Sequence, residues 1–167
     1  MKYRFMSQPL EAGLYEPEGI YLSTPFDGTR QVIQFFGQHP DHYAAFRYNS
    51  IPLRGHPGLD IAMPPGTALF AVDNGRIMAI SFEAGDFERY IKIEHRWGES
   101  LYALVGEIQV EAGQLVKRNE PIAVSGPNRQ NLEPHLHFAI RANPYNRFDG
   151  WGGFTDPLPF LNPSNIV

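Results

Sequence analysis

Pro134-His135-Leu136-His137-Phe138-Ala139-Ile140 is the stretch from which the fold of this chain is inferred. Apolar residues alternate with His135, His137 and Ala139, and this two-residue period predicts a β-strand. Because successive side chains of a strand point to opposite faces, both histidines lie on the same face. Two imidazoles on one face are hard to explain as core. They fit one metal ligand and one neighbour that acts on whatever the metal binds.

The earlier segment Gly55-His56-Pro57-Gly58-Leu59-Asp60 offers the partners for such a metal ligand. Its glycines and proline allow a bend in which the side chains of His56 and Asp60 converge with that of His137. Three nitrogen and oxygen ligands, with a fourth position left to water, are typical of a catalytic zinc site. The chain has no cysteine, which excludes a thiolate site. Each motif alone is weak evidence for a metal site. The inference rests on the order of the two motifs and on the sequence around them.

Both motifs resemble those of a known enzyme family. His56-Pro57-Gly58-Leu59-Asp60, followed by Pro64-Pro65-Gly66-Thr67-Ala68-Leu69-Phe70-Ala71, is similar to the first signature of the M23 (lysostaphin/LytM-type) zinc metallopeptidases. Pro134-His135-Leu136-His137-Phe138 is similar to the second. The resemblance runs from about Pro25 to Leu161. It includes stretches that match the family's central strands and domain end: Ile93-Glu94-His95, Tyr102-Ala103 and Thr155-Asp156-Pro157-Leu158-Pro159-Phe160-Leu161.

The resemblance implies an all-β fold, an antiparallel sheet domain related to the barrel-sandwich hybrid motif, with loop-rich extensions at both ends. The expected division is an N-terminal extension over 1–24, a peptidase domain over 25–161 and a C-terminal tail over 162–167.

The resemblance also implies a set of site residues. His56, Asp60 and His137 would bind Zn2+, and His135 would act on the water and the transition state. The substrate would be a peptide of bacterial cell-wall peptidoglycan.

One position departs from the family pattern. The family carries a histidine directly after the Tyr-Ala of its middle strand, and here that residue is Leu104. Loss of one general acid or base typically removes ~10²–10⁴-fold in rate. Two readings stay open: a zinc endopeptidase with reduced activity, or an inactive zinc-binding relative that binds cell-wall peptide or regulates another hydrolase. His95 is expected to fix a turn or the sheet edge, and His39 and His42 are left out of the site.

A third reading is a non-catalytic carrier, because residues 110–122 resemble the half-motif of biotinyl and lipoyl domains. Such carriers need a modifiable lysine at an exposed hairpin tip. The candidate tip here, Asp73-Asn74-Gly75, has no lysine. The similarity is therefore expected to concern parts of the fold and not the carrier function.

Length and composition limit the number of domains and the kinds of partner this protein can have. The 167 residues suffice for one domain with a core, and the net charge of −4 gives no electrostatic footprint for nucleic acid. No apolar run in the sequence is long enough for a membrane span, and none near Met1 suits a signal peptide. If Met1 is the true start, we expect cytoplasmic synthesis, with release by lysis or a phage-type route.

Local patterns predict the elements. Asn74-Gly75 predicts a β-hairpin between strands at 68–72 and 76–82, because both residues tolerate positive φ. A short helix is expected over 39–46 with Asp41 as its cap. Further strands are expected at 19–22, 31–37, 89–95, 100–105, 110–116 and 120–124, and the aromatic residues after Ala142 are expected to pack across the sheet.

Overall fold

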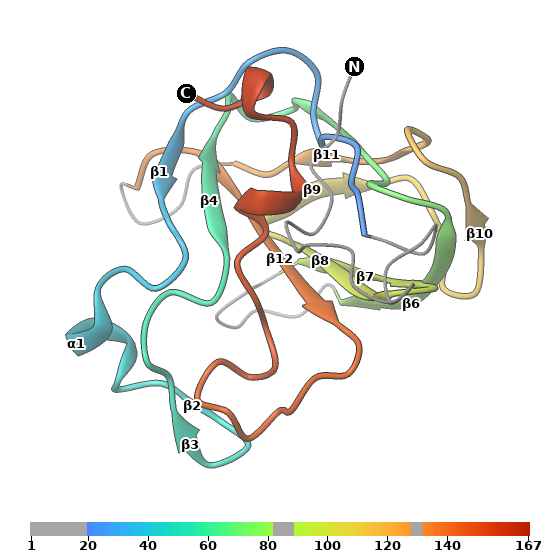
Figure 1. Cartoon of the computed structure of the whole chain (residues 1–167). Helices are drawn as coiled ribbons and strands as arrows, with labels where there is room; N and C mark the ends of the chain where they lie inside the picture. The colour runs from blue at the N-terminus through green and yellow to red at the C-terminus, as the bar shows by residue number, and fades with distance from the viewer. Residues whose placement is uncertain (1–19, 82–88, 128–131) are drawn as a thin grey trace.

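The computed structural model describes residues 20–81, 89–127 and 132–167. The chain folds into β-strands, and its one described α-helix has four residues (Figure 1). The predicted all-β, antiparallel class is confirmed, since every pairing between named strands is antiparallel. Within the described ranges no helix is long and apolar enough to cross a membrane.

Two sheets build the body of the molecule. The seven-stranded sheet has the order β1 (Val32–Gln34), β4 (Leu59–Ala62), β12 (His135–Ala142), β8 (Gly98–Ala103), β7 (Tyr90–His95), β6 (Gly75–Ser81) and β10 (Leu115–Val116). The three-stranded sheet consists of β5 (Ala68–Phe70), β11 (Pro121–Ser125) and β9 (Val105–Ile108). Figure 1 shows β9 and β11 above β6, β7 and β8.

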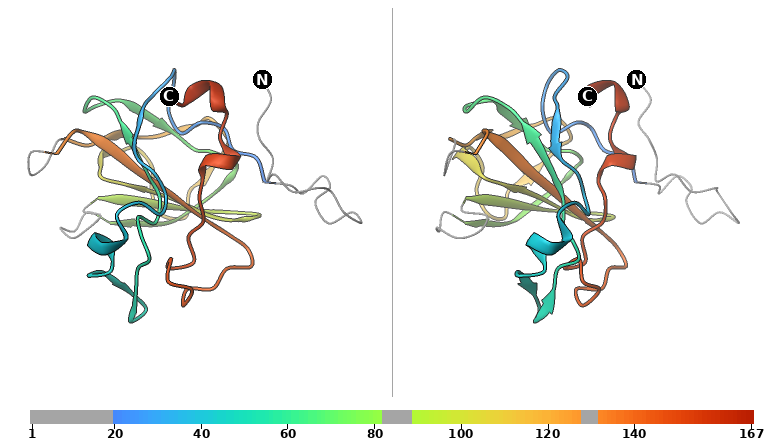
Figure 2. Two further views of the ribbon diagram at one scale, coloured as in Figure 1. Left: turned by 60° about the vertical axis from the view of Figure 1, so that its left-hand side comes forward. Right: turned by 90° about the vertical axis from the view of Figure 1, so that its left-hand side faces the viewer.

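Smaller elements lie around this body. The helix α1 (Pro40–Tyr43) and the hairpin of β2 (Arg47–Tyr48) and β3 (Ile51–Pro52) project from it, as the turned views show (Figure 2). Two 3-10 turns, η1 (Leu158–Phe160) and η2 (Pro163–Asn165), follow near the C-terminus.

The main core lies between the two sheets. Leu136, Phe138 and Ile140 of β12 are fully buried and pack in one cluster with Leu69 of β5 and Ile122 of β11. The alternation expected for this strand is therefore confirmed. Because the apolar side chains of β12 face the core, its histidines lie on the opposite face of the seven-stranded sheet.

The hairpin predicted at Asn74-Gly75 is wrong. β5 pairs with β11, whereas β6 pairs with β7 and β10, so the segment between β5 and β6 is a corner joining the two sheets. Neither Asn74 nor Gly75 has a positive φ. Gly75 is needed for another reason: a Cβ at this position would lie 2.4 Å from the carbonyl oxygen of Glu94. The corner is fixed by buried Asp73, which accepts hydrogen bonds from Trp97 Nε1 and Arg118 Nη2.

Two smaller predictions near the N-terminal side also fail. The residue that caps α1 is His39 rather than Asp41, which lies inside the first turn. No strand forms over the described part of 19–22. Instead Leu22 is fully buried, and its N–H donates to the carbonyl oxygen of Phe160. Residues 1–19 of the expected extension lie outside the described residues.

The C-terminal segment packs against the body, as expected, but unevenly. Phe154 and Phe160 are buried, whereas Phe148 is exposed. The last residues run beside β1, where the N–H of Val32 donates to the carbonyl oxygen of Val167. The segments on both sides of the expected domain 25–161 thus contact it directly.

Candidate metal centre

The pairing of strands aligns the predicted ligands in one row. Asp60 on β4 lies directly opposite His137 on β12, and Gln34 on β1 lies opposite Asp60. On the other side of β12, His137 lies opposite Ala103 of β8. Directly opposed residues of antiparallel strands share a face, so this row lies on the sheet face away from the main core.

His56 reaches the row from the loop before β4. Its N–H donates to the carbonyl oxygen of Gln38, and its own carbonyl accepts from the N–H of Gly37. Gly58 lets this loop lie close on β12, since a Cβ at that position would lie 2.6 Å from the carbonyl oxygen of Phe138. The side chain of His56 is thereby buried beside Asp60.

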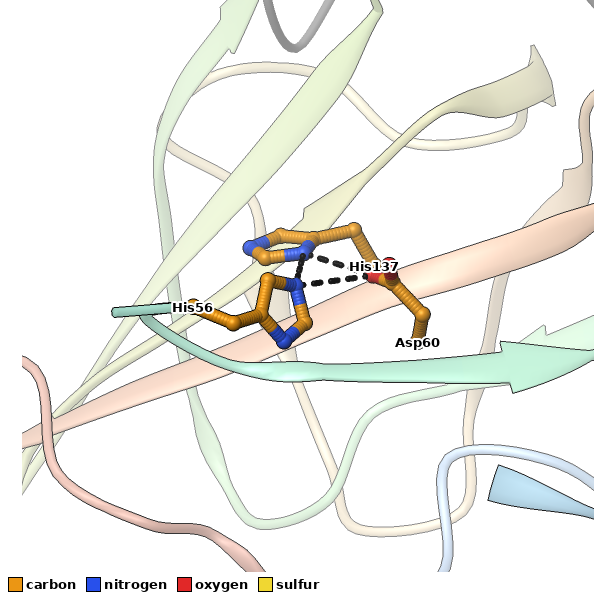
Figure 3. A group of neighbouring side chains, drawn as sticks. All are labelled: His56, Asp60 and His137. Atoms are coloured by element: carbon orange, nitrogen blue, oxygen red, sulfur yellow. Dashed lines mark hydrogen bonds and ion pairs between the residues drawn. The ribbon is translucent and has the colours of Figure 1, made fainter. Parts of the chain in front are cut away.

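The three expected ligands converge on one point (Figure 3). Asp60 Oδ1 lies 3.2 Å from His56 Nε2 and 2.9 Å from His137 Nδ1, and the two nitrogens are 3.2 Å apart. A tetrahedral zinc ion with ligands at ~2.0–2.1 Å holds its ligand atoms ~3.3 Å from one another. The donor set and its spacing therefore fit a divalent metal of this kind.

The outer contact of His56 sets its tautomer. Nδ1 of His56 lies 3.2 Å from the carbonyl oxygen of Phe35. A carbonyl can only accept, so Nδ1 carries the proton and the lone pair of Nε2 faces the site. Metal-binding histidines commonly donate their second nitrogen in this way.

Electrostatics keep Asp60 and His137 in the forms that a metal ion would bind. Burial alone would raise the pKa of Asp60, but hydrogen bonds and charges from His137 and His56 outweigh it and hold that pKa well below its ordinary value. Burial lowers the pKa of His137, against the opposing influence of Asp60. At neutral pH the centre is thus a carboxylate with a neutral imidazole at His137.

His135 lies beside the ligands on the same face of β12. Its Nδ1 is 2.7 Å from the carbonyl oxygen of Glu133, and its Nε2 is 3.7 Å from Asp60 Oδ2. The Nδ1–H therefore donates to that carbonyl, which directs Nε2 toward the centre. The side chain of His135 is 13% exposed, so it lies at the rim of the site.

The other histidines lie elsewhere. His95 is buried at the corner between the sheets, with Nδ1 2.8 Å from the carbonyl oxygen of Asn74 and Nε2 2.8 Å from Ser100 Oγ. This agrees with the structural role expected for it. Leu104 follows β8 directly after Ala103 and takes a left-handed conformation with φ of 63°.

Two residues of the site were not found from the sequence. The ring of Tyr43 on α1 lies 5.4 Å from the ring of His56, centroid to centroid, and its hydroxyl accepts a hydrogen bond from Gln34 Nε2 at 3.0 Å. Neither residue belongs to a recognisable motif. The pairing of β1 with β4 places Gln34 opposite Asp60, and Tyr43 reaches the same region from α1.

Named relatives share part of the chain. A protein of Haemophilus influenzae described as an uncharacterized metalloprotease is 34% identical over 92 residues, covering 54% of this chain and 19% of that protein. The peptidoglycan DD-endopeptidase ShyB of Vibrio cholerae is 34% identical over 88 residues, covering 51% of this chain and 20% of ShyB. The chain thus spans about a fifth of the length of these relatives.

Solved structures share the fold. The catalytic domain of the antimicrobial peptidase lysostaphin from Staphylococcus simulans superposes with a TM-score of 0.56 at 25% identity, covering 76% of this chain and 98% of that domain. The model of peptidase family M23 matches residues 54–148, more than half of the 167 residues. This match contains His135, Leu104 and all three residues of the candidate metal centre. With it the resemblance inferred from the two motifs is confirmed: the chain belongs to peptidase family M23.

Proposed function

We propose that this chain is a zinc metallopeptidase that hydrolyses peptide bonds of bacterial cell-wall peptidoglycan. The observation that carries the proposal is the convergence of His56, Asp60 and His137, with His135 directed at the same point. Family membership supports the reaction class, and the similarity to ShyB, a peptidoglycan DD-endopeptidase, supports the substrate.

The ligand atoms would be His56 Nε2, Asp60 Oδ1 and His137 Nδ1. When bound there, zinc supplies a Lewis acid for the scissile carbonyl and lowers the pKa of a water to ~7. The Phe35 carbonyl orients His56, and the lowered pKa of Asp60 keeps its carboxylate ionised. Zinc is chosen over other divalent metals because two imidazoles and one carboxylate with an open position suit it well.

His135 is the proton carrier in this proposal. With Nδ1–H bound to the carbonyl oxygen of Glu133, neutral His135 presents a lone pair on Nε2. That nitrogen takes a proton from the attacking water and returns it to the leaving amine, which is general base and then general acid catalysis. Its rim position leaves it in reach of a bound peptide.

A second candidate function follows from Leu104. Leucine can neither carry a proton nor donate a hydrogen bond, so a chain with these ligands could bind cell-wall peptide without cleaving it. Such a protein would act as a binding or regulatory relative of the active peptidases.

The deciding experiment incubates the zinc-loaded protein with purified peptidoglycan and measures newly released amino groups. We expect hydrolysis by the wild type. The matched pair His135→Ala and His137→Ala separates chemistry from binding: both lose hydrolysis, but only His137→Ala loses stoichiometric zinc. Zinc-loaded wild type that sediments with peptidoglycan and releases no amines would establish the binding function instead. Full zinc occupancy in His137→Ala would mean that the ligand assignment is wrong.

A further inference from the structure

Lys92 lies on the sheet face that carries the metal centre. Tyr90 of β7 pairs with Ala103 of β8, which in turn pairs with His137, so Tyr90 extends the ligand row across the sheet. Lys92 is two residues further along β7, and its side chain therefore rises from the same face. The side chains of Tyr90 and Lys92 are half-buried, which leaves part of each open to a bound molecule.

The ammonium group of Lys92 is directed toward the ligand row. Its Nζ lies 5.8 Å from the centroid of the Tyr90 ring, within the range of a cation–π contact. The Tyr90 ring packs against a cluster formed by Leu101, Ala139 and Phe154. Tyr90 thus holds the ammonium on the side of Lys92 that faces the metal centre.

No carboxylate of the described residues balances this charge. Glu94 lies on the same face of β7, but on the side of Lys92 away from the ligand row. Glu99 of β8 is bound to Arg141. In the parts of the chain that the structure describes, the Lys92 ammonium forms neither an ion pair nor a hydrogen bond. It is therefore available to an anion from outside the protein.

The surroundings of this ammonium strengthen its attraction for an anion. Lys92 lies opposite Leu101 of β8 and Ala79 of β6, and neither side chain offers a polar group. Where apolar groups exclude part of the water, opposite charges attract more strongly than in bulk solvent. A lysine ammonium has three donors and binds a carboxylate through charge-assisted hydrogen bonds. The position therefore suits a carboxylate brought by the substrate.

A peptide bound at the metal can reach Lys92. Tyr90 is two strands from His137, and neighbouring strands lie ~4.8 Å apart, so the ligand row spans about 10 Å between them. An extended peptide covers that distance in about three residues. We propose that Lys92 is a specificity-determining residue, whose ammonium binds a free carboxylate within about three residues of the cut bond. The site thereby selects acidic cell-wall peptides over uncharged ones. This inference rests on the proposed peptidase function.

The test uses two pairs of synthetic cross-link peptides. The members of a pair are identical, except that one carries a free carboxylate and the other carries the corresponding carboxamide. One pair has this group on the acyl side of the cut bond, and the other pair has it on the amine side. We measure kcat/KM with each zinc-loaded protein, and the Kd of each peptide in the His135→Ala background, where no cleavage is expected.

The proteins compared are wild type, Lys92→Met and Lys92→Glu, with Lys117→Met as the matched control. Lys117 is exposed in the turn after β10, and its change also removes one ammonium. For one of the two pairs we expect wild type to prefer the carboxylate peptide by about tenfold in kcat/KM, as for one charge-assisted hydrogen bond. Added salt should reduce this preference, because it screens a partly exposed ion pair.

Lys92→Met should cleave both members of that pair at similar rates, and Lys92→Glu should prefer the carboxamide. Lys117→Met should keep the wild-type preference. The Kd ratios should follow the same order. A role of Lys92 in the packing of the sheet alone would not change the ratio between two peptides that differ in one charge.

Equal cleavage of both members of each pair by wild type would overturn the role of Lys92 and leave the peptidase function intact. So would an unchanged preference in Lys92→Met. If wild type cleaves none of the four peptides, the proposed function fails for these substrates, and the Kd ratios decide whether Lys92 recognises a carboxylate. If Lys92→Met does not fold, Lys92→Gln takes its place in the same comparison.

Discussion

The side chain of Leu104 is expected to limit the rate of peptide hydrolysis. It lies one residue beyond Ala103, which pairs with His137, and its φ of 63° is uncommon for leucine. Histidine is several-fold enriched in this conformation relative to most residues. A histidine at 104 would therefore fit the backbone and add a proton carrier beside the ligand row.

We expect Leu104→His to raise the rate of peptidoglycan hydrolysis, by up to the ~10²–10⁴-fold typical of a general acid or base. The measurement is amine release by zinc-loaded variants at equal zinc occupancy. Leu104→Ala is the control, because it removes the leucine side chain and adds no proton carrier. No gain in Leu104→His at full zinc occupancy would show that the surrounding groove, and not the proton carrier alone, has diverged.

Some site residues could be placed from the sequence and others could not. The alternation in β12 was enough to place His135 and His137 on one face, because strand geometry is local. Tyr43 and Gln34 could not be found in this way. Gln34 lies beside Asp60 because β1 pairs with β4 across a register irregularity that no local pattern encodes. Tyr43 approaches His56 from α1, through a contact between residues distant in sequence.

At the scale of elements, the corner at Asp73-Asn74-Gly75 shows why a strong turn signal failed. Asn-Gly usually predicts a hairpin because both residues tolerate positive φ. Here glycine serves close packing, and tertiary hydrogen bonds to Asp73 direct the chain into the second sheet. Strands overlap the predicted ranges 31–37, 68–72, 76–82, 89–95 and 120–124. The predicted strand 100–105 is divided between β8 and β9 at Leu104, and only Leu115–Val116 of the range 110–116 is a strand. The assignment of strands to two sheets depends on contacts distant in sequence.

Gly75→Ala tests this explanation. The added Cβ would meet the carbonyl oxygen of Glu94 at 2.4 Å, so β6 and β7 must move apart. We expect a loss of about 1–3 kcal/mol in the free energy of unfolding, as for other overpacked sites. Urea denaturation measures it. Gly28→Ala is the control, since nothing lies within 4 Å of its added Cβ and only its φ of 77° opposes the change. Equal losses in the two variants would contradict the packing role.

For the whole molecule, the buried corner histidine predicts a pH dependence of stability. Burial lowers the pKa of His95, while the Asn74 carbonyl opposes this effect. The unfolded chain therefore binds a proton near the ordinary pKa of ~6.5, and the folded chain binds it only at lower pH. The contribution of His95 to stability is present above pH ~6.5 and is lost as the pH falls below it.

We expect His95→Gln to flatten the fall in unfolding free energy between about pH 7 and pH 5, compared with wild type. Urea denaturation of the metal-free proteins at each pH measures the difference. Comparing variant with wild type removes the contribution of His137, whose pKa is also lowered. Parallel profiles for the two proteins would show that His95 titrates alike in the folded and unfolded states.

Arg141 joins distant parts of the chain from the centre of the large sheet. It is fully buried on β12, where its guanidinium donates to Glu99 of β8, to the Tyr48 hydroxyl of β2 and to the carbonyl oxygen of Gly152. It also lies 3.9 Å from the centroid of the Phe154 ring. These contacts tie the β2–β3 hairpin and the C-terminal segment to the strand that carries His135 and His137.

Breaking a buried ion pair on one side leaves the other charge without compensation, which typically costs ~3–5 kcal/mol. We therefore expect Arg141→Met to lower the free energy of unfolding by about that amount, since Glu99 would remain buried beside an apolar side chain. The double variant Arg141→Met/Glu99→Gln should recover part of the loss, because the stranded charge is removed. Urea denaturation of both variants and of Glu99→Gln closes the cycle. The double variant could instead lose as much free energy of unfolding as the two single variants lose together. The Arg141–Glu99 pair would then not be coupled, and packing of Tyr48 and Phe154 would hold the hairpin and the C-terminal segment.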